Sequence, residues 1–168
     1  NLGESLKIKI NARYYTQLVD NIAPNSLTGE TFTSEDNINF IISHQADKIR
    51  TDFEVYFTSY FGDEFLDDEQ GNRFSESFYD QIFLKPEIKT VYKISNKKEF
   101  VFGLGNEYET LDRTYFEIEP KQNSPFIYFQ YDYNPNEKVN LILGGRFDKY
   151  KEYKSVSYTH LTLPTISR

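Results

Sequence analysis

Charged side chains two positions apart on an expected strand are the residues best placed for chemistry in this sequence. Arg146 and Asp148 have this spacing, so in a β-strand they share one face, although the spacing alone does not bring them into contact. Bond-making chemistry has little support, because only His44 of the two histidines is a credible imidazole for a Ser–His–acid arrangement. We therefore expect a binding protein and not an enzyme.

Acidic residues form a second candidate site between Gly62 and Ser77. A calcium loop needs a glycine turn at a fixed place among its ligands, and Gly71 does not fall at that place. We interpret this stretch as a solvated loop, with binding of calcium or a cationic ligand as the alternative. For the chain as a whole we predict no metal and no cofactor. The residues concerned are Asp63, Glu64, Asp67, Asp68 and Glu69.

Composition excludes several other classes of function. The net charge of −7, without a basic patch, disfavours nucleic acid as a partner. The absence of cysteine excludes disulfides, thiolate metal sites and cysteine nucleophiles. The closely spaced glycines fall inside expected strands, where they permit close packing or curvature and do not form a phosphate-binding loop. These are Gly103, Gly105, Gly144 and Gly145.

Alternation of apolar and polar residues predicts the β-strands that position these side chains. The clearest case is Ser124–Lys154, in which two alternating runs are joined by the polar link Asn134–Glu137 and should form a hairpin. Pro86 lies inside an expected strand, so we predict a bulge or other irregularity there. The remaining strands are expected over residues 6–18, 35–43, 49–61, 78–94 and 99–111.

The connections between these strands are expected to be alternately long and short. This sorting is typical of an up-and-down membrane barrel, which has short turns on one side of the membrane and longer loops on the other. Expected strands of about nine to fifteen residues could also cross a bilayer at a tilt. The 17% of aromatic residues suits barrel girdles or the core of a soluble β-sandwich, and the absence of Trp counts mildly against girdles.

The hairpin resembles the barrel of TonB-dependent outer-membrane receptors, particularly those of Bacteroidetes-like bacteria. The similar elements are Ser124–Phe126, Gln130–Asp132, Asn134–Lys138 and Gly144–Asp148 followed by Tyr150 and Tyr153. Gly103–Tyr108 is similar to the preceding barrel strand of that family. The resemblance covers residues 78–154 and extends loosely upstream to Leu6.

The resemblance implies an all-β fold of antiparallel up-and-down strands that forms part of a transmembrane β-barrel wall. The chain would supply about seven strands of a barrel that has roughly 22 strands and a plugged lumen. It also implies a location in the bacterial outer membrane, with lipid as a partner. The expected activity is uptake of a scarce, bulky ligand, most often a ferric siderophore. Energy for uptake would come from TonB through a plug segment that this sequence lacks.

Six residues are candidates for ligand binding, in the lumen or in loops. Arg13, Glu107, Arg146 and Asp148 belong to a larger set of expected lumen-facing residues, with Asp52, Glu54, Glu109, Gln130 and Asp132. This set could line a hydrated path or contact the plug, but the favoured interpretation is that alternation simply makes the inner face polar. Tyr108 and Tyr115, with Phe116, are expected near the mouth, where they could hold a ligand or, more simply, anchor the membrane interface.

The end of the sequence departs from the family. Residues 156–168 resemble translated sequencing adapter, so we expect a barrel fragment over residues 1–155 followed by a non-native tail. The sequence contains no Met, which also fits a fragment. Two alternatives stay open, namely a soluble β-sandwich binding module and an outer-membrane barrel enzyme.

Overall fold

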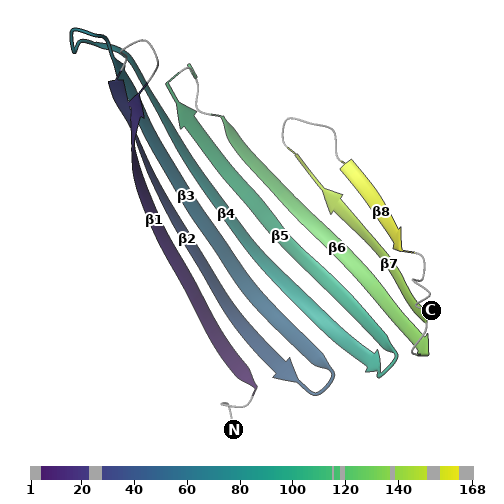
Figure 1. Cartoon of the computed structure of the whole chain (residues 1–168). Helices are drawn as coiled ribbons and strands as arrows, with labels where there is room; N and C mark the ends of the chain where they lie inside the picture. Colours follow the sequence, from purple (N-terminus) through teal and green to yellow (C-terminus); the bar gives the residue numbers. More distant parts are fainter. Residues whose placement is uncertain are drawn as a thin grey trace.

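The protein folds into one open antiparallel sheet, in which each strand pairs with the next along the chain (Figure 1). The computed structural model describes residues 5–22, 28–114, 116–117, 120–136, 139–150 and 156–162. The described part contains no helix. The strands are β1 (Leu6–Ile22), β2 (Thr28–Ala46), β3 (Ile49–Asp67), β4 (Arg73–Ser95), β5 (Lys98–Arg113), β6 (Lys121–Asn136), β7 (Val139–Asp148) and β8 (Val156–Thr162).

The all-β, up-and-down fold is thus confirmed, and all seven expected strands are present. An eighth strand, β8, forms in the tail, where no strand was predicted. The predicted long loops were too long, because β2 begins at Thr28 and β3 continues to Asp67. Polar residues at these strand ends suggested loops, yet their backbones are hydrogen-bonded to neighbouring strands and their polar side chains remain solvated.

The alternation of connection lengths is also confirmed. Two residues separate β2 from β3, β4 from β5 and β6 from β7, and these strand ends lie at the end of the sheet where the N-terminus lies (Figure 1). At the opposite end, five to seven residues separate consecutive strands, and we call these stretches the longer connections. His44 follows the strand expected over residues 35–43, but it lies within the longer observed β2, paired with Leu6 and Thr51.

Pro86 interrupts the sheet without a bulge. The register between β4 and β5 is the same on both sides of Lys85 and Pro86, which lack partners in that ladder. Because proline has no N–H, it cannot donate to the ladder, and the irregularity stays local. The register shifts lie elsewhere, at Leu66/Asp67, Lys93/Ser95 and Tyr133/Asn136.

One face of the sheet is apolar and exposed. In a single register row it presents an apolar side chain from each of seven strands: Ile8, Ile42, Phe53, Ile88, Leu104, Ile127 and Phe147. Leu104 is 46% exposed, and Ile10 in the next row is 66% exposed. At β8 the residue in this register row is Ser157, so the apolar row ends at β7.

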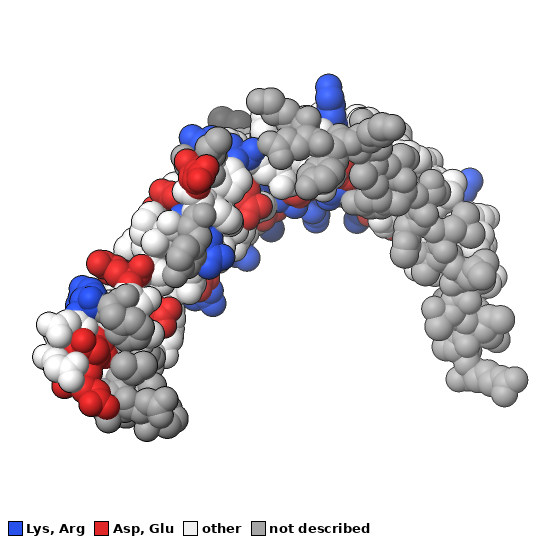
Figure 2. All heavy atoms as spheres, turned by 90° about the horizontal axis from the view of Figure 1, so that it is seen from above, with Lys and Arg blue, Asp and Glu red and all other residues white. Residues whose placement is uncertain are grey.

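The other face is polar and lies on the inner side of a curved sheet. Viewed along the strands, the sheet is an open arch, with charged side chains along its inner side (Figure 2). The register places all nine residues expected to face a lumen on this polar face. Curvature crowds these side chains, and Asp52, Phe126 and Asp148 are buried.

Two glycines of β5 let aromatic rings lie flat on the polar face. A Cβ on Gly103 would stand 2.2 Å from Cζ of Tyr128, and one on Gly105 would stand 2.5 Å from Cζ of Phe126. The two rings are themselves stacked, with centroids 6.3 Å apart. The predicted role of these glycines in close packing is therefore confirmed.

Candidate functional site

Three side chains from β5 and β7 form the most tightly connected polar group on the inner face, which we call the Arg146 cluster (Glu107, Arg146 and Asp148). Arg146 Nε donates to Asp148 Oδ1 and Oδ2 at 2.9 and 3.0 Å. Its Nη2 donates to Asp148 Oδ1 at 2.7 Å and to Glu107 Oε1 at 3.2 Å. Asp148 is only 1% exposed, so its charge depends on this guanidinium.

Aromatic packing fixes the position of the cluster. The guanidinium carbon of Arg146 lies 4.2 Å from the centroid of the Phe126 ring, and Lys85 Nζ lies 5.3 Å from the same centroid. Lys85 also pairs with Glu87, at 3.3 Å, and Glu87 accepts a hydrogen bond from the Tyr128 hydroxyl at 2.5 Å. The Arg146 guanidinium is thus held both by its ion pairs and by the face of the Phe126 ring, which restricts its movement.

The remaining predicted site residues do not join this cluster. Arg13 pairs with Glu35 at 2.7 Å, across β1 and β2, on an exposed part of the same face. Tyr108 follows Glu107 directly in β5, so its side chain lies on the opposite, apolar face. Tyr115 lies outside the described residues. The structure therefore brings together Glu107, Arg146 and Asp148, but not Arg13 or Tyr108.

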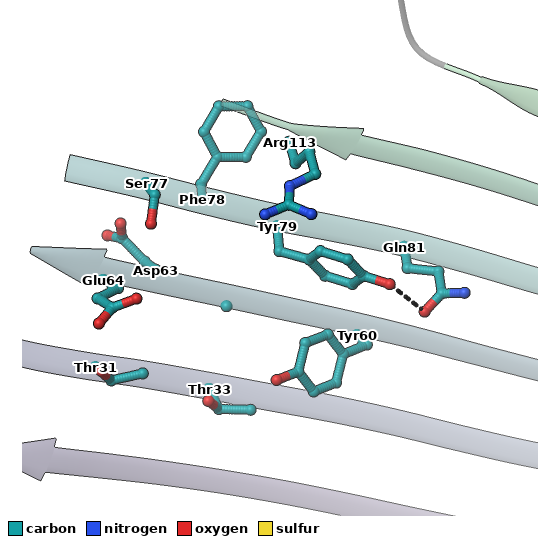
Figure 3. Close-up of a pocket in the computed structure, with 11 residues that line it drawn as sticks. Thr31, Thr33, Tyr60, Asp63, Glu64, Ser77, Phe78, Tyr79, Gln81 and Arg113 are labelled. Atoms are coloured by element: carbon teal, nitrogen blue, oxygen red, sulfur yellow. Dashed lines mark hydrogen bonds between the residues drawn. The ribbon is translucent and has the colours of Figure 1, made fainter. Parts of the chain in front are cut away.

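A hollow of about 480 Å³ lies near the longer connections, and we call it the Tyr60 hollow (Figure 3). The Tyr60 and Tyr79 rings meet edge to face with centroids 5.4 Å apart. The Tyr79 hydroxyl donates to Gln81 Oε1 at 2.9 Å, and Gln81 in turn donates to Glu109. Other lining residues are Thr31, Thr33, Gly62, Asp63, Glu64, Ser77, Phe78 and Arg113.

The chemistry of the Tyr60 hollow is that of binding. It presents two phenol groups, an amide, carboxylates and the Arg113 guanidinium, so it can stack against rings and exchange hydrogen bonds. The sequence did not predict this hollow, because the polar residues of Gly62–Ser77 resemble those of a loop. The available signal was the alternation of Tyr56, Thr58 and Tyr60, which continues through Gly62 to Glu64 on one face.

Part of the predicted acidic loop is an ordered turn. The Asp68 carboxylate accepts hydrogen bonds from the backbone N–H groups of Asn72 and Gln70, at 2.8 and 2.9 Å. These bonds, that from Asn72 first, hold the pKa of Asp68 below its ordinary value. Gly71 has a φ of 78°, which glycine adopts without strain. The carboxylate therefore closes the turn.

The part of the chain that the structure describes contains neither a metal-binding cluster nor a membrane-spanning helix. No group of three or more His, Cys, Asp or Glu residues there could hold a metal ion. Within the same residues, no helix has the length and apolar character needed to cross a membrane. Neither a protein-family model nor a curated protein matches this sequence.

Proposed function

We propose that this chain forms part of the wall of a bacterial outer-membrane β-barrel, with its apolar face against lipid and its polar face toward the lumen. The apolar row across seven strands is the observation that carries the proposal. An apolar surface of this extent is unfavourable in water, but it matches the hydrocarbon core of a bilayer. A soluble sandwich would instead have to bury this face under a second sheet.

Strand length supports the same proposal. A strand tilted by about 45° needs roughly 9–11 residues to cross the hydrocarbon core. β1 to β6 have between 16 and 23 residues, enough to cross the core and continue beyond it. The longer connections then belong on the outer side of the membrane, as in barrels of this kind. The Tyr60 hollow accordingly lies near the outer mouth.

We further propose that the barrel serves TonB-dependent uptake of a scarce, bulky ligand, with ferric siderophores as the leading class. Support comes from the sequence resemblance and from the Tyr60 hollow, whose rings and hydrogen-bonding groups suit a ligand with aromatic and polar parts. Uptake of this kind proceeds by binding and conformational gating, without bond chemistry on the ligand. The Arg146 cluster would then keep the lumen wall rigid.

Fractionation tests the membrane proposal. The open reading frame that contains this sequence is expressed with its own leader in a Gram-negative host, and outer membranes are separated from soluble and inner-membrane fractions. We expect the product in the outer membrane, with mobility in mild detergent that changes only on heating. Recovery in the soluble fraction would contradict the proposal.

Uptake tests the cargo proposal separately. Accumulation of radioactive iron from a panel of ferric siderophores is compared in hosts with and without TonB. We expect accumulation that requires both the protein and TonB. Outer-membrane insertion without TonB-dependent uptake of any siderophore in the panel would leave the barrel intact and reject this class of cargo.

A further inference from the structure

A second hollow, also of about 480 Å³, lies on the polar face toward the short-turn end of the sheet. We call it the Lys7 hollow, and its charged lining includes Lys7, Lys9, Arg50, Asp52 and Lys89. The register explains its position, because Lys7, Ser43, Asp52 and Lys89 form one row across β1 to β4. The short side chain of Ser43 leaves space between the longer ones.

The hollow carries an excess of positive charge. Four cationic side chains line it, against the carboxylates of Asp52 and Glu54, although the whole chain has a net charge of −7. Both carboxylates already have partners. Asp52 is 8% exposed and pairs with Arg50 at 3.2 Å and Lys89 at 3.9 Å, while Glu54 accepts a hydrogen bond from Asn39.

Lys7 and Lys9 are the two cations of the lining that do not pair with these carboxylates. Both are exposed, both point to the polar face, and neither forms an ion pair with any residue that the structure describes. They are two positions apart on β1, so their ammonium groups can converge on one ligand. They line one hollow with Arg50 and Lys89, and the surplus charge of its lining is positive.

We propose that the Lys7 hollow binds a multiply charged oxyanion, carrying phosphate or carboxylate groups. Several ammonium groups and a guanidinium around a concave surface suit such a ligand, because each anionic oxygen can accept a charged hydrogen bond. The Ser43 hydroxyl adds a neutral donor on the floor. This site goes beyond the proposed uptake function, since it depends only on the polar face of the sheet and not on a closed barrel.

Calorimetry on the 168-residue chain, refolded in detergent micelles, tests the proposal. Pyrophosphate and citrate are titrated separately at low ionic strength, so that the two arms distinguish phosphate from carboxylate ligands. We expect saturable binding of at least one of them at a single site, weakened by added salt. The double variant Lys7→Gln/Lys9→Gln should weaken this binding about tenfold, the effect of two solvated charge contacts together.

A charge-matched control is Lys97→Gln/Lys149→Gln, which removes two lysines that do not line the hollow and should change binding less than twofold. A second variant, Ser43→Asp, keeps both lysines but places a carboxylate directly across from Lys7, and it should also weaken binding. Circular dichroism confirms β-structure in each variant. The proposal is overturned by absence of saturable binding of both anions, by equal weakening in the control, or by unchanged affinity in Ser43→Asp.

Discussion

The two faces of this sheet share every strand, yet different forces hold their side chains. On the inner face, neighbouring strands are joined by ion pairs and hydrogen bonds, such as those that join Glu107, Arg146 and Asp148. On the outer face, the row from Ile8 to Phe147 offers only apolar surface. Many polar groups of the inner face thus pair with one another, whereas the outer face requires an apolar surrounding, and this difference is the main argument for a membrane.

The inner face is itself uneven. The Arg146 cluster is packed against Phe126 and holds the buried Asp148, whereas Arg13 and Glu35 keep 68% and 29% of their side-chain surface exposed. Water therefore screens the Arg13–Glu35 pair more strongly than the Arg146–Asp148 pair. The same chemistry should therefore contribute very differently to stability at the two places.

Removing the arginine at each place should give the largest contrast. Arg146→Ala leaves Asp148 buried without its partner and should lower the free energy of unfolding by roughly 3–5 kcal/mol. Arg13→Ala breaks an exposed pair and should cost less than about 1 kcal/mol. Urea unfolding in lipid vesicles measures both, and similar losses would show that burial does not separate the two pairs.

Introducing a charge on either face should give the second-largest difference in stability. Leu104→Arg places a cation on the apolar face, and in vesicles it should cost roughly 2–4 kcal/mol if the position lies near the bilayer midplane. Val101→Arg, on the same strand but the polar face, should cost less than about half as much. Folding yields and urea midpoints in vesicles check this, and equal costs would contradict the assignment of the faces.

Filling a glycine tests the close packing of rings on the inner face. Gly103→Ala would push a methyl group into the Tyr128 ring and should cost about 1–3 kcal/mol. Gly62→Ala is the matched control, because its methyl group would meet Tyr60 Cε1 at an ordinary 3.6 Å. Unfolding of both variants in micelles gives the comparison, and an unaffected Gly103→Ala would mean that the ring moves freely.

The smallest effect is expected at the Asp68 turn, away from both faces. Since the pKa of Asp68 is lowered, its ionised carboxylate fully stabilises the turn at any pH above the ordinary aspartate pKa. This stabilisation is lost as the pH falls through the lowered pKa. Asp68→Asn should therefore increase proteolysis at residues 68–72 near pH 7 and differ little from wild type in strong acid. Glu69→Gln is the control, and equal cleavage of the two variants at pH 7 would exclude a role for the Asp68 carboxylate.

The fold could be predicted from the sequence because alternation fixes both strands and faces. The alternation of apolar and polar residues predicted seven strands and placed nine polar residues, including Asp52 and Gln130, on one face. Strand ends were missed because solvated strand residues such as Glu64 resemble loop residues. The Tyr60 hollow was missed because it joins residues of β2, β3, β4 and β5, and the register between those strands follows from pairing and not from local pattern.

Accessibility of single cysteines along β3 tests the membrane account most directly, since the sequence contains no cysteine of its own. Spin labels are attached in turn at residues 53 to 58 in vesicles containing the product of the complete reading frame. The account predicts that accessibility alternates with a period of two. Oxygen should reach the labels on the apolar face, at Phe53, Val55 and Phe57. A water-soluble nickel reagent should reach the labels on the polar face, at Glu54, Tyr56 and Thr58. Uniform access of the water-soluble reagent to all six positions would contradict it.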